Sequence, residues 1–209
     1  MNFKIENYNV SVLINNYKEN MPVFVLNSYE SIIDNLKENS SYILVEVSNI
    51  NWNKDMTPWK YNEFSGKADN YLSKLLNKII PKVNEYVASK NITITYYALV
   101  GYSLAGLFSM YVASKNTIFT RFGGISSSLW YKDFTEYFKK FNYDNKKFYM
   151  SLGKDEKKSK NKVLRSVEEN TLEIYKYLGD KAYFKFNPGG HFNNSNERIL
   201  KCIKYLTEN

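Results

Sequence analysis

The uncharged stretch from Asn91 to Ser114 constrains the fold more than any other feature of this sequence. Its length would allow one helix to cross a bilayer. However, residues 92–100 are rich in β-branched and aromatic side chains, and Gly101 interrupts the run before a helix-like segment at Leu104–Ala113. A buried strand, a tight turn and a buried helix explain this pattern, so we expect no membrane span and no membrane partner.

Strands and helices are expected to alternate along the rest of the chain. Apolar runs predict strands within residues 1–15 and at 21–26, 41–47, 121–126, 147–152 and 182–186. Apolar spacings of three and four predict helices at 32–36, from Ala68 to Val87 with an interruption at Pro81, and at 134–141, 163–178 and 197–206. An irregular loop is expected at 48–66. A repeated strand-then-helix order predicts an α/β fold: a mostly parallel central sheet with helices on both faces, a three-layer α/β/α sandwich.

Length and composition fit one globular domain. The chain has 209 residues, of which 44% are hydrophobic and 24% charged, so we expect a single domain over residues 1–209 with no separate lid domain. Cys202 is the only cysteine and His191 the only histidine. These counts exclude an internal disulfide and a structural zinc site of Cys and His ligands. We expect neither a metal nor a cofactor.

The basic charge raises the question of a nucleic-acid partner. The chain carries 29 Lys and Arg residues against 21 Asp and Glu, a net charge of +8. Only Arg121, Arg165 and Arg198 are arginines, whereas proteins that read phosphates and bases favour the guanidinium fork. Excess lysine alongside many Asn, Ile and Tyr residues fits a codon bias toward A and T, so no nucleic-acid partner is expected. The N-terminus lacks the pattern of a secretory signal, which predicts a cytoplasmic location.

A candidate nucleophile lies where the strand at 92–100 ends. Ligand sites of open α/β sheets form beyond the carboxyl ends of strands. Ser103 lies between such a strand and an apolar helix, as in a nucleophile elbow, and the small residues Gly101 and Ala105 allow the close approach that this turn needs. Ala105 departs from the G-x-S-x-G pattern by one methyl group. The alternative is that Ser103 only caps the helix starting at Leu104.

A candidate base and acid follow two later strands. His191 lies in a glycine-rich turn directly after the last predicted strand, and imidazole is the usual base for a serine hydroxyl. Asp155 and Glu156 follow the strand at 147–152. Each residue alone could belong to a solvated loop, but nucleophile, acid and histidine come in the order that α/β-hydrolases use, at three strand ends. The pattern does not separate Asp155 from Glu156.

Together these motifs resemble the putative esterase family of α/β-hydrolases, which includes S-formylglutathione hydrolase, siderophore trilactone esterases and mycolyltransferases. The resemblance rests on residues 101–106, 48–53 with 57–59, 66–72 with 79–81, 126–130, 151–153 with Glu156, and 189–191. It implies an α/β-hydrolase fold, with Ser103 as nucleophile and His191 as general base and then acid. The family's spacing after Ser151–Gly153 favours Glu156 as the acid, with Asp155 as the competitor.

The same machinery needs two backbone donors for an oxyanion. The N–H of Leu104 is expected to supply one, and the loop at 48–51, with Ile50 as our choice, the other. Trp52, Trp130 and Tyr102 are expected to bind substrate, with Trp59 as a further candidate. Ordinary packing explains the tryptophans equally well.

The sequence thus predicts a serine hydrolase acting on a small-molecule carboxylic ester, or a thioester, through an acyl-enzyme. Acyl transfer by the same residues is one alternative, and a non-catalytic binding protein of this fold is another. The sequence does not determine the acyl group or the alcohol of the ester. It also leaves the oligomeric state open, and a homodimer is one possibility.

Overall fold

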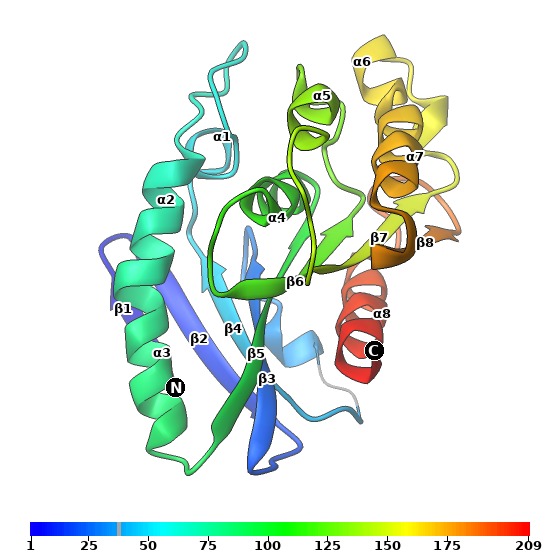
Figure 1. Ribbon diagram of the computed structural model, residues 1–209. Coiled ribbons are helices and arrows are strands. Elements are labelled where there is room, and N and C mark those ends of the chain that lie inside the picture. Colours follow the sequence, from blue (N-terminus) through cyan, green and yellow to red (C-terminus); the bar gives the residue numbers. More distant parts are fainter. Residues whose placement is uncertain (37–38) are drawn as a thin grey trace.

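The computed structural model describes residues 1–36 and 39–209 and is built around an eight-stranded sheet (Figure 1). The strand order is β1-β2-β4-β3-β5-β6-β7-β8. The strands are β1 (Asn2–Ile5), β2 (Tyr8–Asn15), β3 (Asn20–Asn27), β4 (Tyr42–Ser48), β5 (Thr93–Tyr102), β6 (Phe119–Ile125), β7 (Lys147–Gly153) and β8 (Ala182–Asn187). β2 pairs antiparallel with β1 and β4, and all pairs from β4 to β8 are parallel. The predicted mostly parallel sheet is confirmed.

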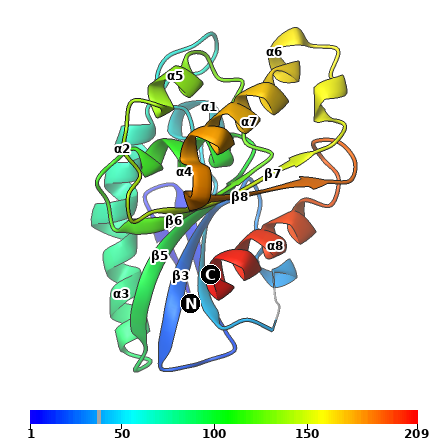
Figure 2. The same ribbon diagram turned by 45° about the vertical axis from the view of Figure 1, so that its right-hand side comes forward.

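Helices cover both faces of this sheet. They are α1 (Trp52–Asp55), α2 (Ala68–Lys74), α3 (Ile80–Ala88), α4 (Leu104–Ala113), α5 (Phe134–Phe138), α6 (Lys162–Arg165), α7 (Val167–Leu178) and α8 (Ser195–Glu208). Helices α2, α3, α4 and α7 pack on one face, and α8 packs on the other (Figure 2). The predicted three-layer α/β arrangement is therefore present.

The central strands are apolar on both faces because both faces are covered. In β3, Val23 and Val25 join the larger core cluster under α2–α4 and α7, while Phe24 and Leu26 join the smaller cluster under α8. All four side chains are at most 1% exposed. Burial of each contributes roughly 1.5–3 kcal/mol, so the sheet centre is a rigid base for the loops at its edge.

The helix expected from Ala68 to Val87 is irregular where the sequence places Pro81. A π-helical segment, Leu75–Ile79, joins α2 to α3, and the Ile80 N–H donates to the Leu75 carbonyl. Proline lacks an N–H and its ring collides with the carbonyl four residues earlier. The wider π turn accommodates the proline, so the chain stays helical through this point.

Other expected boundaries shift in the structure. Residues 33–35 form only a 3-10 turn, and residues 37–38, next to the expected helix at 32–36, lie outside the described part. The expected helix at 163–178 is divided at Ser166, whose hydroxyl donates to the Val163 carbonyl. The helix expected at 134–141 ends at Phe138. No helix in the described ranges is both long and apolar enough to cross a membrane.

Candidate active site

Ser103 occupies a strained turn between β5 and α4. Its φ and ψ are 57° and −120°, a conformation that costs a non-glycine residue about 1–3 kcal/mol. The turn closes tightly: a Cβ atom at Gly101 would lie 2.0 Å from the Ala105 carbonyl oxygen, so only glycine fits. Ala105 itself is fully buried, which shows that its extra methyl group is accommodated.

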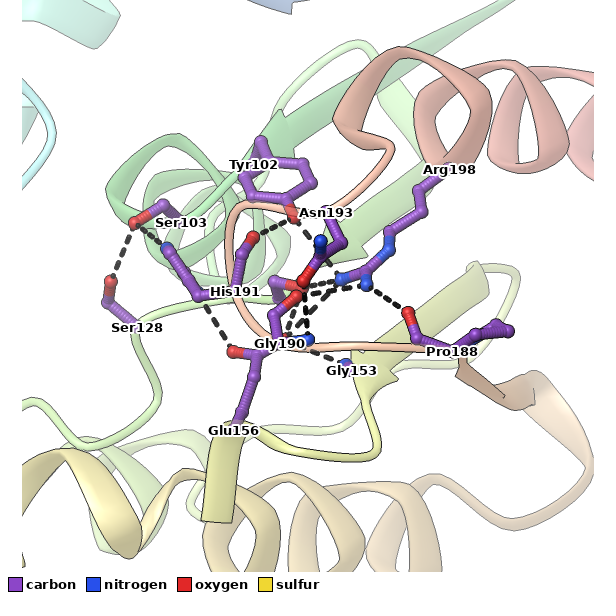
Figure 3. A network of polar contacts seen from close by, with 11 residues as sticks. Tyr102, Ser103, Ser128, Gly153, Glu156, Pro188, Gly190, His191, Asn193 and Arg198 are labelled. Atoms are coloured by element: carbon purple, nitrogen blue, oxygen red, sulfur yellow. Dashed lines mark hydrogen bonds and ion pairs between the residues drawn. The ribbon is translucent and has the colours of Figure 1, made fainter. Parts of the chain in front are cut away.

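The backbone around Ser103 is held on both sides. Its N–H donates to the Ile125 carbonyl at 3.0 Å, and its own carbonyl accepts from the N–H groups of Leu107 and Ser128, each at 3.0 Å. Its hydroxyl makes no capping bond to α4. The side chain instead points to His191 and Ser128 (Figure 3).

Glu156 follows β7, and its carboxylate is buried. Its Oε1 accepts from the Gly153 N–H and the Ser126 hydroxyl, both at 2.7 Å, and its Oε2 lies 2.8 Å from His191 Nδ1. Burial alone would raise the pKa of Glu156, but hydrogen bonds from His191, Ser126 and Gly153 outweigh burial and lower it. Glu156 is therefore ionised at neutral pH.

His191 lies between Glu156 and Ser103 (Figure 3). Its Nε2 is 3.1 Å from the Ser103 Oγ. Because an ionised carboxylate can only accept hydrogen bonds, the proton of the neutral ring is assigned to Nδ1. Nε2 then offers its lone pair to the serine hydroxyl, which is the arrangement a general base needs.

Asp155, the competing acid, lies outside this chain of contacts. Its side chain is 45% exposed and pairs with Lys158 at 2.5 Å. Its backbone N–H donates to the Gly189 carbonyl at 3.1 Å, so Asp155 contributes to the loop contact through its main chain. Gly153 permits that contact, since a Cβ there would lie 2.6 Å from the Gly189 carbonyl oxygen.

The two expected oxyanion donors lie in different places. Leu104 is the first residue of α4, next to Ser103, and its N–H is one of the groups a helix leaves unpaired at its start. Ile50 follows β4, which β3 separates from β5. Its side chain is 7% exposed and joins the larger core cluster. The loop after β3 lies nearer: Ser28 and Tyr29 line a cavity together with Ser103.

Two cavities share Ser103 in their linings. The first, about 300 Å³, is bounded by the loop after β3, Trp52, Tyr102 and the start of α8; we call it the β3-side cavity. The second, about 360 Å³, is the α7-side cavity, bounded by His191, Trp130 and four apolar side chains: Leu104, Leu164, Val167 and Phe192. A ligand bound at Ser103 could place one group in each cavity.

The three expected aromatic ligand contacts, Trp52, Trp130 and Tyr102, line these cavities. Trp59, the further candidate, packs against Tyr131, Phe134 and Tyr137, and its indole N–H donates to the Lys132 carbonyl at 3.2 Å. It lines neither cavity, so ordinary packing accounts for it.

Sequence reasoning missed three side chains that support the site. Ser126 donates to Glu156, the Ser128 Oγ lies 3.4 Å from the Ser103 Oγ, and Arg198 contacts the acid and the histidine loop. Both serines belong to the motif at 126–130, which by itself gives neither of them a separate role. Arg198 could have been found, because it interrupts the apolar face of α8 formed by Ile199, Cys202, Ile203 and Leu206.

Within residues 1–36 and 39–209, no group of three or more His, Cys, Asp and Glu side chains lies close enough together to hold a metal ion. The charged groups at the site pair with one another.

Comparisons with known proteins show the family to which this chain belongs. The sequence profile of the family described as “Putative esterase” matches residues 26–192. The uncharacterized protein YbbA of Bacillus subtilis strain 168 is 27% identical over 153 residues, which cover 68% of this chain. The match covers 60% of that protein, so this chain spans less than two thirds of its length.

Solved structures show the same fold. The siderophore hydrolase EstB from Aspergillus nidulans matches with a TM-score of 0.82 and 17% identity, over 100% of this chain and 94% of that one. An IroE-like serine hydrolase from Shewanella oneidensis matches with a TM-score of 0.77 and 18% identity, over 96% of this chain and 76% of that one. The α/β-hydrolase-like fold expected from the sequence is confirmed.

Proposed function

Because this chain belongs to the putative esterase family, we propose that it is a serine hydrolase that cleaves a carboxylic ester through an acyl-enzyme. The observation that carries the proposal is the continuous set of contacts from the Ser103 Oγ through His191 to Glu156, at 3.1 and 2.8 Å. Such an arrangement activates a hydroxyl that is otherwise a poor nucleophile.

The reaction follows from the proton positions. His191 Nε2 takes the Ser103 proton as Oγ attacks the ester carbonyl carbon, and the ring then gives this proton to the leaving alcohol as the C–O bond breaks. Water attacks the resulting acyl-serine, with Nε2 again as base, and releases the acid. Glu156 stays ionised throughout and stabilises the imidazolium. A thioester would react by the same steps with a thiol leaving group.

The tetrahedral intermediate needs donors for its oxyanion. We assign one to the Leu104 N–H and the other to the loop after β3. In that loop the Ser28 N–H donates to the Val47 carbonyl at 3.0 Å, so Ser28 is already used. The next N–H, of Tyr29, belongs to a residue that borders the β3-side cavity with Ser103. Tyr29 therefore replaces Ile50 as our candidate for the second donor.

The two cavities favour an ester with a sizeable group on each side of the reacting bond. The α7-side cavity is walled by Leu164, Val167 and Trp130, so it suits an apolar group. The β3-side cavity mixes Trp52 with polar side chains such as Asn196. EstB is named as a siderophore hydrolase, so siderophore esters belong in the substrate panel beside aryl esters and thioesters.

A fluorophosphonate probe tests the proposal directly. We expect one adduct, located on Ser103 by mass spectrometry, which Ser103→Ala abolishes and His191→Ala slows strongly. Ser73→Ala, an exposed serine on α2, serves as the matched control and should label normally. Absence of an adduct on the folded wild-type protein, or labelling that ignores His191, would refute a hydrolase and favour a ligand-binding role.

A further inference from the structure

The loop that carries His191 has to reach back across the sheet. β8 is separated from β5 by β7 and β6, and three strand spacings amount to about 14 Å. Strand β8 ends at Asn187, and the four residues from there to His191 extend at most about 14 Å. The loop can cover this span only by leaning over the ends of β7 and β6, so contacts outside the loop have to hold it there.

Arg198, in the first turn of α8, supplies such contacts. Its side chain is 1% exposed, and a buried cation needs partners. Its Nη2 donates to the carbonyls of Pro188 and Gly190, at 2.8 and 3.0 Å (Figure 3). Both carbonyls belong to the loop, on either side of Gly189. One planar group thus fixes two points of the four-residue span.

Tyr102 fixes a third point of the same loop. Its hydroxyl donates to the His191 carbonyl and accepts from Arg198 Nη1, at 3.3 Å for the second contact. Burial raises the pKa of Tyr102, so the phenol keeps the proton it donates. Since Tyr102 directly precedes Ser103, this bond ties the histidine loop to the nucleophile's own turn.

Arg198 also reaches the acid. Its Nη1 donates to the Ser126 hydroxyl at 3.1 Å and lies 3.6 Å from Glu156 Oε1. The Ser126 hydroxyl has one proton, and it uses this proton to donate a hydrogen bond to Glu156 Oε1. The guanidinium therefore donates to Ser126, which donates to Glu156, and to Tyr102, which donates to the His191 carbonyl.

We propose that Arg198 is a positioning residue that sets the relative placement of Glu156, His191 and Ser103. It touches no reacting atom and acts through Ser126, Tyr102 and the loop carbonyls. The proposal rests on the hydrolase function proposed above.

Lysine cannot reproduce these contacts. Four acceptors surround the two terminal nitrogens of Arg198, and the planar fork addresses them in fixed directions, whereas an ammonium is a single point with three rotatable donors. Placement errors of about 1 Å in a catalytic group lower rates by about 10²-fold. Arg198→Lys should therefore lower kcat by about 10- to 100-fold and leave KM within about twofold.

Arg121→Lys provides the matched control. Arg121 lies on β6, donates to the Leu206 carbonyl at the far end of α8, and stacks on Tyr96 at 3.8 Å. Arg121→Lys thus makes the same arginine-to-lysine change and weakens a contact of the same helix, α8, at the end far from the site. Both variants are expected to lower Tm, but only Arg198→Lys should lower kcat with a p-nitrophenyl ester and the rate of fluorophosphonate labelling. Arg198→Gln, which removes the charge, is a second test variant.

His191 supplies a readout that does not depend on turnover, because it is the only histidine. For the neutral form of the ring, imidazole ¹⁵N NMR should show a protonated Nδ1 and an unprotonated Nε2 in the wild type and in Arg121→Lys. In Arg198→Lys and Arg198→Gln we expect a mixture of tautomers, since the partner of Nδ1 is no longer fixed.

The outcomes separate this inference from the proposed function. If the probe does not label the wild-type protein at all, the proposed hydrolase function is refuted. The NMR comparison then still decides whether Arg198 orders the His191 ring. The positioning role would be overturned if folded Arg198→Lys had a labelling rate and a kcat within about twofold of those of Arg121→Lys and the same imidazole tautomer.

Discussion

Replacing Glu156 by glutamine tests the acid while preserving its shape. The amide introduced by Glu156→Gln has one oxygen, whereas the carboxylate accepts from Gly153, Ser126 and His191 with two. If the amide oxygen faces Gly153 and Ser126, two of the three bonds survive. If the amide NH₂ faces them, both bonds are lost, at about 1–3 kcal/mol for each unsatisfied group. The first orientation should therefore dominate.

That orientation turns the NH₂ group toward His191 Nδ1. The ring must then accept at Nδ1 and carry its proton on Nε2, so Nε2 can no longer take the Ser103 proton. The equivalent acid-to-amide substitution in the serine protease triad lowers kcat by about 10⁴-fold, which corresponds to about 5 kcal/mol of barrier. We expect a loss of this size for Glu156→Gln with little change in KM.

Asp155→Asn is the matched control, since it makes the same change one residue earlier. Asp155 is exposed and contacts Lys158 rather than His191, so kcat should stay within about twofold. Steady-state hydrolysis of a p-nitrophenyl ester measures both variants. The reasoning would be refuted if Asp155→Asn cost as much as Glu156→Gln, or if Glu156→Gln kept nearly full kcat.

Four further outcomes are expected. Gly101→Ala should destabilise the fold by more than about 2 kcal/mol in urea unfolding, because its methyl group would lie 2.0 Å from a carbonyl oxygen. Phe192→Ala should raise KM for apolar esters several-fold without moving Tm, because Phe192 is 91% exposed yet lines the α7-side cavity. Tyr29→Pro, which removes the N–H, should lower kcat by about 10²-fold, whereas Tyr29→Ala should not. The pKa of Glu156 in the folded state lies below its ordinary 4.5, so its ionised carboxylate contributes fully to stability above pH 4.5, and this contribution is lost as the pH falls through the lowered pKa. The difference in unfolding free energy between the wild type and Glu156→Gln should therefore become smaller in acid. Urea unfolding at several pH values measures this difference.

The fold was predictable because its strongest signals are local. The uncharged stretch from Asn91 to Ser114 forms β5 and α4, and the expected helix at Leu104–Ala113 has those same bounds. Pro81 shows the limit of local reasoning. The sequence indicates that a regular helix cannot pass through it, but a π turn and packing on the core keep the chain helical.

The choice of acid was not predictable from residue types, because Asp155 and Glu156 are adjacent carboxylates in one loop. The structure separates them through a single 3-10 turn that begins at Glu156. The turn directs the Glu156 side chain inward and leaves that of Asp155 in solvent beside Lys158. Strand order, which sequence alone does not reveal, also bears on the second oxyanion donor: because β3 rather than β4 lies beside β5, we propose Tyr29 in place of Ile50.

Arg198 carries the more general lesson for reading such a sequence. In a chain whose cations are mostly lysine, an arginine on the apolar face of a helix contradicts the amphipathic pattern around it. Burying that charge costs free energy unless several fixed acceptors compensate, and here the acceptors are the His191 loop, Tyr102 and Ser126. A buried arginine on an apolar helix face therefore indicates where a fold uses a polar contact network, in place of apolar packing, to position its loops.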